Sequence, residues 1–357
     1  MALGEVLEAG AIVIGGGVAG MRAALALAQQ GVQVMLVEKE NELGGRLLRS
    51  NVTFPDMAPA AQIVQELVLK VQAEERIAVL LSSPVHDIEK GTGFSVEIER
   101  DAGKCMQRRV VHAPAIVLAT GMSAIDPTMM PELGYGRAKN VITAEELEDM
   151  LRSGKIIRPS DGAPAKAVAF VQCVGSRVEK RGVPYCSAVC CANAIKDAIA
   201  LKGSDHAMDV YVLYIDIRTC GKGQEALYKQ ARAMGVRFIR GQPSMVVRRP
   251  GSERVLVCGE NTLLKELYEI PADLVVLSCG LTISKEDREL LQALGVEFTP
   301  EGLIATRFLL GVETSVPGVF VAGTLEAPKE VKYATSQGAE AGAVAAAFVK
   351  RALDEAR

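Results

Sequence analysis

A glycine-rich turn close to the start of the sequence restricts the fold of this chain more than any other feature. An apolar run opens at Ala11 and leads into Gly15-Gly16-Gly17-Val18-Ala19-Gly20, after which an Ala/Leu-rich stretch continues to Gly31. A second apolar run covers Val32–Val37. Strand, glycine turn, helix and strand in this order form the context in which a G-x-G-x-x-G pattern predicts a dinucleotide-binding site.

Each glycine of the pattern has its own steric role. Gly15 permits the tight turn, Gly17 lets the backbone approach a pyrophosphate, and Gly20 lets the helix lie close to the strand. The helix N-terminus then offers N–H groups and the positive end of its dipole to the phosphates. Glu38 ends the second strand, where a carboxylate can accept both ribose hydroxyls of an adenosine. A glycine turn that binds nothing is the alternative, and the position of Glu38 argues against it.

Composition favours an α/β protein with two domains. A chain of 357 residues exceeds the size at which one hydrophobic core stops growing. Its 34 glycines, with no Trp and 4% aromatic residues, suit tight turns packed against aliphatic strands better than an all-β sandwich. The formal net charge is only −3, so no overall field would attract nucleic acid, and we expect none as a partner.

The sequence contains no apolar run of roughly 18 residues, and its N-terminus has no basic segment followed by an apolar one and a cleavage site. We therefore expect a cytoplasmic protein without direct membrane insertion. Eight cysteines in such a chain point away from a disulfide framework. They favour thiols that bind metal or carry out redox chemistry.

A second domain of the same kind is predicted further along the chain. The apolar run Ala115–Leu118 ends in Ala119-Thr120-Gly121, and Ala272–Cys279 before Gly280 repeats that pattern. Between them, Ala167–Gln172 is predicted to be the first strand of a dinucleotide domain. Cys173-Val174-Gly175-Ser176-Arg177 follows it in place of a glycine turn, which puts NAD(P)H binding there in question.

The later segments continue this α/β pattern. A strand at Val210–Ile215 and a helix after Gly223 extend the second domain. A buried strand at Val319–Ala322 and a closing helix at Ala334–Phe348 then return the chain to the first domain. The predicted domains are therefore a discontinuous first domain, 1–158 with 284–357, and a second domain over 159–283.

Four cysteines fall close together as Cys173-x12-Cys186-x3-Cys190-Cys191. Four thiolates are what an iron–sulfur cluster of the [4Fe-4S] type requires. The spacing of Cys186 and Cys190 places them on one helical face, while Cys173 approaches from a strand end. Arg177, Lys180 and Arg181 lie in the intervening loop, where positive charge would offset the negative charge of a thiolate-bound cluster.

Three other interpretations of these cysteines stay open: buried structural thiols, a structural zinc site, and a redox dithiol formed by Cys190 and Cys191. The chain has no C-x-x-C pair, which a thioredoxin-reductase-like dithiol and most zinc sites would show. The remaining cysteines are isolated in the sequence and are interpreted as small apolar residues: Cys105, Cys220, Cys258 and Cys279.

Further motifs accompany the cysteine signature: Pro184-Tyr185, Asp216-Ile217-Arg218, Gly221-Lys222-Gly223, Val312-Glu313-Thr314, Ala322-Gly323 and Pro328-Lys329. Together, over nearly the whole chain, they resemble the flavoprotein A subunit of heterodisulfide reductases. Asn41–Arg46 and Ala119-Thr120-Gly121 resemble segments of flavoprotein disulfide reductases that contact FAD. The resemblance implies an α/β fold with two Rossmann-like dinucleotide-binding domains of the thioredoxin-reductase and flavoprotein disulfide reductase type.

The resemblance also implies two cofactors, FAD in the first domain and a [4Fe-4S] cluster in a degenerate NAD(P)H-type domain. The cluster ligands would be Cys173, Cys186, Cys190 and Cys191. The FAD-binding residues would be Gly15, Gly17, Val18, Ala19, Gly20, Glu38, Lys39, Gly44, Gly45, Arg46, Ala119, Thr120, Gly121, Gly323, Thr324 and Lys329.

Two places near the C-terminal end of the chain affect the contacts that we expect to the flavin. Many related flavoproteins have Gly-Asp where this chain has Gly323-Thr324, so a carboxylate contact to FAD is missing or supplied differently. Lys329 follows the last strand of the FAD domain, where a cation near the flavin would stabilise its reduced anionic form. An ordinary solvated lysine is the alternative for Lys329.

Full-length members of the resembled family carry further N-terminal and ferredoxin segments with C-x2-C-x2-C-x3-C runs, which this sequence does not contain. The chain therefore resembles the compact forms in heterodisulfide-reductase-like complexes of sulfur oxidisers or in the quinone-interacting oxidoreductase of sulfate reducers. The resemblance implies an electron-transfer subunit in sulfur metabolism, with other subunits as partners and a homodimer as its own assembly. The alternatives are a freestanding NAD(P)H-dependent disulfide or polysulfide reductase using Cys190 or Cys191, and a scaffold without cofactors.

Overall fold

The computed structural model describes residues 6–101, 106–249, 251–308 and 311–355, so Cys105 lies outside the described part of the chain. The chain divides into two compact units. The first unit consists of the segments that end at Leu48, run over Ala61–Ser123 and begin again at Ile283. The second consists of Arg49–Ala60 and Ala124–Thr282.

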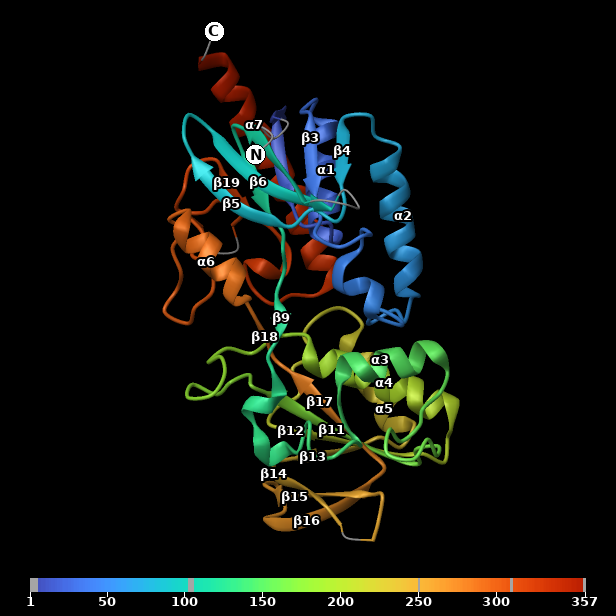
Figure 1. Ribbon diagram of the computed structural model, residues 1–357. Helices are drawn as coiled ribbons and strands as arrows, with labels where there is room; N and C mark the ends of the chain where they lie inside the picture. Colours follow the sequence, from blue (N-terminus) through green and yellow to red (C-terminus); the bar gives the residue numbers. More distant parts are fainter. Residues whose placement is uncertain (1–5, 102–105, 250, 309–310, 356–357) are drawn as a thin grey trace. The chain divides into compact units, whose positions relative to one another are not determined.

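The first unit is built on a five-stranded parallel sheet in the order β19-β8-β2-β3-β4, of which Figure 1 labels β3, β4 and β19. Its strands are β2 (Ala11–Ile14), β3 (Val34–Val37), β4 (Ile77–Leu80), β8 (Ile116–Leu118) and β19 (Val319–Val321). A four-stranded sheet in the order β1-β7-β6-β5 accompanies it, with β1 (Val6–Glu8), β5 (Val85–Lys90), β6 (Phe94–Asp101) and β7 (Met106–Ala113). The helices of this unit are α1 (Val18–Gln29), α2 (Ala60–Gln72), α6 (Lys285–Ala293) and α7 (Val331–Glu355), with short 3-10 turns η1 (Gly45–Arg49) and η4 (Gly323–Leu325).

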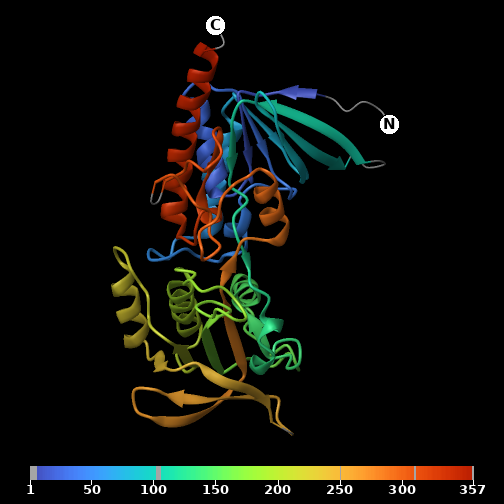
Figure 2. The ribbon, with the colours of Figure 1, turned by 90° about the vertical axis from the view of Figure 1, so that its left-hand side faces the viewer.

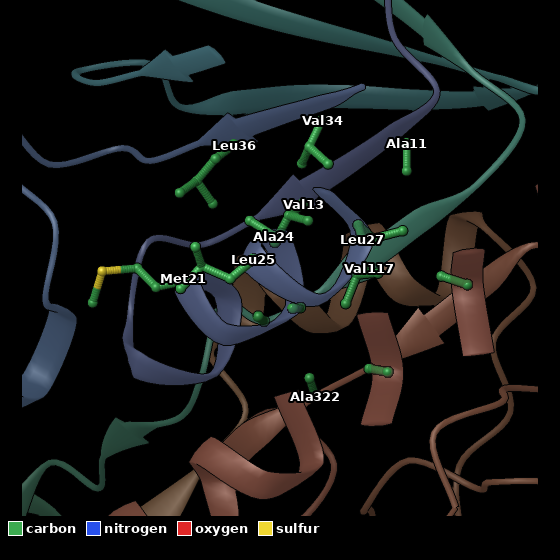
Figure 3. Packing of buried hydrophobic residues seen from close by; sticks show 14 of the residues in the cluster. Ala11, Val13, Met21, Ala24, Leu25, Leu27, Val34, Leu36, Val117 and Ala322 are labelled. Atoms are coloured by element: carbon green, nitrogen blue, oxygen red, sulfur yellow. The ribbon is translucent and has the colours of Figure 1, made fainter. Parts of the chain in front are cut away.

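The core of the first unit lies between the parallel sheet and α1 (Figure 3). Met21, Leu25 and Leu27 of α1 are buried together with strand residues such as Val13 and Leu36. All residues of β2 and β3 are buried, which is the pattern of parallel strands covered on both faces. The nearly continuous apolar runs at Ala11 and Val32 therefore reflect burial on both sides.

Helix α7 packs along α1, as Figure 2 shows for the red and blue helices. A Cβ atom added to Gly338 would lie 2.2 Å from the carbonyl oxygen of Ala19, and one on Gly342 would lie 2.3 Å from that of Ala23. Only glycine permits this approach, because the obstacle is backbone. The predicted closing helix is confirmed and is longer than expected. No helix in the described part of the chain, α7 included, is long and apolar enough to cross a bilayer.

The second unit repeats the parallel architecture, with a five-stranded sheet in the order β10-β17-β11-β12-β13. These strands are β10 (Val141–Thr143), β11 (Ala167–Val174), β12 (Asp209–Tyr214), β13 (Arg237–Arg240) and β17 (Leu274–Cys279). A three-stranded antiparallel sheet contains β14 (Pro243–Arg248), β15 (Val255–Asn261) and β16 (Glu266–Ala272). The helices are α3 (Ala144–Ser153), α4 (Cys190–Ser204) and α5 (Gln224–Ala233), with 3-10 turns η2 (Pro127–Met129) and η3 (Pro131–Leu133). The short strands β9 (Ser123–Ala124) and β18 (Leu281–Thr282) lie where the chain passes between the units.

The chain passes between the two compact units after Ser123 and again before Ile283, whereas the domain prediction has its boundaries after residues 158 and 283. The reason is that β10 pairs with β17, with Val141 opposite Val275, so residues 124–158 complete the second sheet. The segment 49–60 also belongs to the second unit, and the sequence analysis missed it.

A buried group of charges fastens α3, α4 and segment 49–60 together in the second unit. The ammonium of Lys196 donates to Glu148 and, at 2.7 Å, to Asp197. The amide of Asn193 donates to Asp197 at 3.1 Å, and the backbone N–H of Asn51 donates to Glu148 at 2.8 Å. Burial raises the pKa of Asp197 to about 7. Burial by itself would lower the pKa of Lys196, but the two carboxylates raise it by more, so the ammonium stays charged.

Replacing Lys196 by Met should destabilise the second unit strongly. The change leaves two buried carboxyl groups without their cation, and breaking a buried ion pair in this way costs about 3–5 kcal/mol. Urea denaturation followed by circular dichroism measures the loss. Lys229→Met is the matched control, because Lys229 forms an exposed ion pair with Glu225 and should change stability by less than about 1 kcal/mol. Equal effects of the two variants would contradict the role assigned to Lys196.

Asp197 should make stability depend on pH. Its pKa is 3.8 in the unfolded reference and about 7 in the folded unit, so its contribution is fully present below about pH 4 and is lost as pH rises through 7. Asn cannot lose a proton, so wild type should lose stability relative to Asp197→Asn between pH 5 and pH 8. Urea midpoints of both proteins at these two pH values measure the difference, and a constant difference would disprove the linkage.

Candidate functional site

The first candidate site lies where the parallel strands of the first unit end. Gly15 follows β2, Glu38 follows β3, Ala119 follows β8 and Ala322 follows β19. These four strands are neighbours in the sheet, so their carboxyl ends form one edge. Open parallel sheets bind ligands at the carboxyl ends of their strands, in the crevice at the point where the strand order reverses. The predicted FAD-binding residues, which come from separate segments of the sequence, therefore lie together at this edge of the sheet.

The glycine turn has the geometry that a dinucleotide requires. Gly15 has φ +108°, and an added Cβ would lie 2.4 Å from the carbonyl oxygen of Ala119. A Cβ on Gly20 would lie 1.8 Å from the carbonyl oxygen of Gly15, so α1 contacts the turn directly through its backbone. A Cβ on Gly17 would meet no atom within 4 Å. Open space therefore remains over Gly17, where a pyrophosphate would lie.

The Glu38 carboxylate is fixed by the backbone around it. Its Oε2 accepts a hydrogen bond from the Gly16 N–H at 2.5 Å, and Oε1 accepts one from the Glu40 N–H at 2.9 Å. The residue is only 6% exposed. Each carboxylate oxygen keeps a further lone pair, so the group can still accept hydrogen bonds from a ribose. Lys39 beside it is exposed.

A second loop, Asn41–Arg46, lies against the glycine turn. The N–H of Gly44 donates to the carbonyl oxygen of Gly16 at 2.9 Å. An added Cβ on Gly45, which has φ +56°, would lie 3.1 Å from the Cα of Gly17. Arg46 donates to the carbonyl oxygen of Met122 at 3.4 Å. The loop that the sequence analysis assigned to FAD therefore borders the same space as the turn.

Two polar side chains that were not predicted from the sequence, Gln337 and Glu326, lie beside the segment that follows the last strand. Gly323 has φ +72°, and its N–H donates to Oε1 of Gln337 on α7 at 3.0 Å. The Gln337 amide also donates to the carboxylate of Glu326 at 3.3 Å. A glutamine among the small residues of a buried helix face was the available signal for this contact. Thr324 lies near Gly121, whose added Cβ would be 3.3 Å from the Thr324 hydroxyl.

Lys329 is neither free nor fully solvated. Its ammonium donates to the Glu326 carboxylate at 2.7 Å and to the carbonyl oxygen of Gly323 at 2.6 Å. Burial lowers the pKa of Lys329, and Glu326 opposes that effect. The lysine is held against the turn that follows β19, but its charge is paired with a carboxylate three residues earlier.

The second candidate site lies between β11 and α4 in the second unit. Cys173 ends the regular part of β11, and Cys190 and Cys191 begin α4. The prediction that Cys186 shares a helical face with Cys190 is wrong, because Cys186 lies in the loop before the helix. The Ser187 hydroxyl accepts the Leu281 N–H at 2.8 Å, and Ala188 takes a left-handed φ of +58°. These features prevent an earlier start of the helix.

Backbone polar groups surround the thiols. The Cys190 thiol donates to the carbonyl oxygen of Cys279 at 3.7 Å, and the Cys191 thiol donates to that of Asp216 at 3.6 Å. The Ala188 N–H donates to the sulfur of Cys186 at 3.4 Å. Cys279, isolated in the sequence, therefore adjoins the group. Cys258 lies apart on β15, and Cys220 is exposed.

Burial favours the neutral form of three of these thiols, those of Cys173, Cys190 and Cys191. Burial raises the pKa of Cys173 to about 11, with neighbouring Cys191 adding to the effect and Arg177 opposing it. Burial and the surrounding thiols raise the pKa of Cys190 further, and burial also raises that of Cys191. A reactive cysteine requires the opposite, a lowered pKa and access to solvent. The geometry therefore disfavours Cys190 and Cys191 as an exposed nucleophilic dithiol.

No group of three or more His, Cys, Asp or Glu side chains among the described residues is gathered tightly enough to hold a single metal ion. A four-iron cluster binds its thiolates at separate iron atoms, so its ligands need not meet at one point. As a donor set, the four free thiols, with Arg177 next to Cys173 and Cys191, fit such a cluster, and one nitrogen of Arg177 is buried without a hydrogen-bond partner.

The family model for pyridine nucleotide-disulphide oxidoreductases matches residues 10–338. The chain is 33% identical to the iron-sulfur A subunit of the CoB–CoM heterodisulfide reductase of Methanocaldococcus jannaschii, over 97% of this chain and 65% of that protein. It is also 33% identical to the A subunit of the H2/formate:CoB-CoM heterodisulfide,ferredoxin reductase of Methanococcus maripaludis, over 94% of this chain and 63% of that protein. The predicted resemblance is thus confirmed, and the chain spans less than two thirds of the length of these relatives.

Solved thioredoxin reductases share the fold. The enzyme of T. acidophilum superposes with a TM-score of 0.67 at 17% identity, covering 98% of this chain and 99% of that structure. The enzyme of Lactococcus lactis gives 0.65 at 18% identity, covering 98% and 100%. The predicted α/β fold of thioredoxin-reductase type is therefore confirmed, and the family match supports FAD binding in the first unit.

Two glycine variants should separate nucleotide binding from folding. Gly17→Val adds a side chain where the protein leaves open space, so the apoprotein should keep its thermal midpoint while purified protein loses at least about 90% of its FAD. Gly20→Val places a side chain on the carbonyl oxygen of Gly15 and should lower the apoprotein midpoint. Flavin absorbance and thermal denaturation measure both effects. Full FAD content in Gly17→Val would contradict the placement of the pyrophosphate.

Proposed function

This chain is an oxidoreductase of the pyridine nucleotide-disulphide oxidoreductase family, and we propose that it is an FAD- and [4Fe-4S]-containing electron-transfer subunit of a heterodisulfide-reductase-like complex in sulfur metabolism. One observation carries the proposal: the two units have the same parallel architecture, but the first keeps the glycine turn and the second has four cysteines around the corresponding loop. Two similar scaffolds thus present two different cofactor sites.

In the first unit, the residues bind and orient the dinucleotide. The backbone at Gly17 leaves room for the pyrophosphate, and the fixed Glu38 carboxylate accepts the ribose hydroxyls. Lys329 and Glu326 form an ion pair without net charge beside the last strand. Thr324 stands where many related flavoproteins have an aspartate. In this proposal Lys329 tunes the flavin through its position against the Gly323 turn. FAD, when bound, exchanges electrons in pairs or singly.

In the second unit, the cysteines would hold the [4Fe-4S] cluster, which accepts one electron at a time. Cys190 and Cys191 lie at the N-terminus of α4, where the helix dipole stabilises thiolates. Arg177 adds a full positive charge next to Cys173. Because burial raises the pKa values of these thiols, binding of a cationic centre is what would deprotonate them.

Asp216 argues against NAD(P)H in the second unit. It lies just after β12, where an acidic residue of a dinucleotide domain would bind a ribose. Its carboxylate instead accepts a hydrogen bond from Arg177 at 2.9 Å and lies 3.8 Å from Arg240. With the glycine turn also replaced, we infer that electrons reach the chain from another protein.

The names of the relatives support the partners in this proposal. They are subunits of enzymes acting on the CoB–CoM heterodisulfide. Reducing a disulfide to two thiols consumes two electrons and two protons, and this chain, with its buried thiols, would relay the electrons while another subunit binds the sulfur compound. We further propose a homodimer as the assembly of this chain.

Anaerobic purification with iron, sulfide and flavin assays tests both cofactors together. Wild type should contain about one FAD and about four irons per chain, and Cys190→Ala should lose most of its iron while keeping FAD. Cys258→Ala is the matched control, because Cys258 lies on β15 outside the cysteine group, and its iron content should equal that of wild type.

Three other results would each contradict a specific part of the proposal. FAD without iron in wild type would eliminate the cluster. NADH-dependent reduction of a disulfide by the isolated, iron-free chain would favour a freestanding reductase using Cys190 and Cys191. A colourless protein without either cofactor would favour a scaffold.

A further inference from the structure

The loop after β11 holds Arg177 in a conformation that few residues adopt. Arg177 has φ +63°, and Cys173 has φ +60°. Left-handed backbone is costly for residues other than glycine and persists only where surrounding contacts enforce it. The backbone turns twice within five residues, and the Ser176 N–H donates to the carbonyl oxygen of Cys173 at 3.2 Å, so Arg177 directly follows a turn that closes on Cys173.

Asp216 fixes the guanidinium at the cysteine group. One terminal nitrogen of Arg177 donates to the Asp216 carboxylate at 2.9 Å. The main-chain carbonyl of Asp216 accepts the Cys191 thiol at 3.6 Å. The same residue therefore touches the arginine through its side chain and a cysteine through its backbone, which leaves Arg177 little freedom to point elsewhere.

The other terminal nitrogen, Nη1, is buried and has no hydrogen-bond partner. A buried N–H group without an acceptor costs about 1–3 kcal/mol and more when charged, so native proteins rarely keep one without a function. The neighbouring loop cation differs, because Arg181 is exposed and pairs with Glu132 at 3.3 Å. Of these two arginines, Arg177 combines an ion pair with Asp216, partial burial of its side chain and a buried donor nitrogen without a partner.

Building on the proposed function, we propose that Arg177 sets the reduction potential of the cluster by donating its free N–H group to sulfur at the Cys173 position. A hydrogen bond to sulfur and a nearby positive charge both stabilise the reduced cluster, which carries one more negative charge than the oxidised one. Asp216 acts as the positioning residue for this donor. Arg177 thereby makes the cluster a better electron acceptor.

The test is a potentiometric titration of the anaerobic protein, followed by electron paramagnetic resonance, on wild type, Arg177→Gln, Arg177→Lys and Arg181→Gln. In Arg177→Gln the ratio of reduced to oxidised cluster at a fixed potential should fall about tenfold, a shift of about 59 mV to lower potential for one electron. Arg177→Lys keeps the charge but not the planar donor, and should fall between that variant and wild type. Arg181→Gln should match wild type.

The outcomes separate this inference from the proposed function. Wild type without iron would overturn the cluster itself and, with it, the role of Arg177. A loaded Arg177→Gln variant with the wild-type potential would overturn the inference and leave the cluster intact. If Arg177→Gln cannot bind iron, Arg177→Lys decides, because an unchanged potential there would show that the guanidinium donor is not needed and would overturn the inference.

Discussion

The contact on which the first unit depends is one between two stretches of backbone. Helix α1 begins so close to the end of β2 that a single carbon added to Gly20 would overlap the carbonyl oxygen of Gly15. This approach aims the N-terminus of α1 at the edge where four strands end, and α7 then closes over α1 through its own glycines. The placement of α1 and the open space at Gly17 depend on this close packing.

The sequence was sufficient to predict what local chemistry determines. The glycine turn, the closing helix and seven strands of the two parallel sheets follow from residue spacing and apolar runs, and the structure has them close to where they were expected: β2, β3, β8, β11, β12, β17 and β19. The contacts of Lys329 with Glu326, and of Gln337 with Gly323, could not be predicted, because they join segments whose proximity only the folded unit creates. Likewise the early crossing after Ser123 depends on β10 pairing with a strand more than a hundred residues later. The loop position of Cys186 was missed because spacing alone favours a helix there.

In both units a helix N-terminus follows a parallel strand, and the units differ in the group that would supply negative charge there. A helix N-terminus at the end of a parallel strand favours negative charge. In the first unit, the glycines leave that place open to the phosphates of a dinucleotide. In the second, the corresponding loop carries side chains that would themselves supply the negative charge as thiolates, together with an arginine that would balance it. In the proposed function, backbone groups would bind an anion in the first unit, and sulfur atoms would supply the negative charge in the second.

The segment 49–60 determines which parts of the sequence are needed to encode the second unit. It lies between two stretches of the first unit in the sequence, yet its Asn51 donates to Glu148, which accepts the buried ammonium of Lys196. A gene fragment coding only for residues 124–282 would encode the second sheet but leave out a partner of its buried charges. Recombination that moved the second unit with all partners of its buried charges would therefore have to carry sequence from two separated places, 49–60 and 124–282.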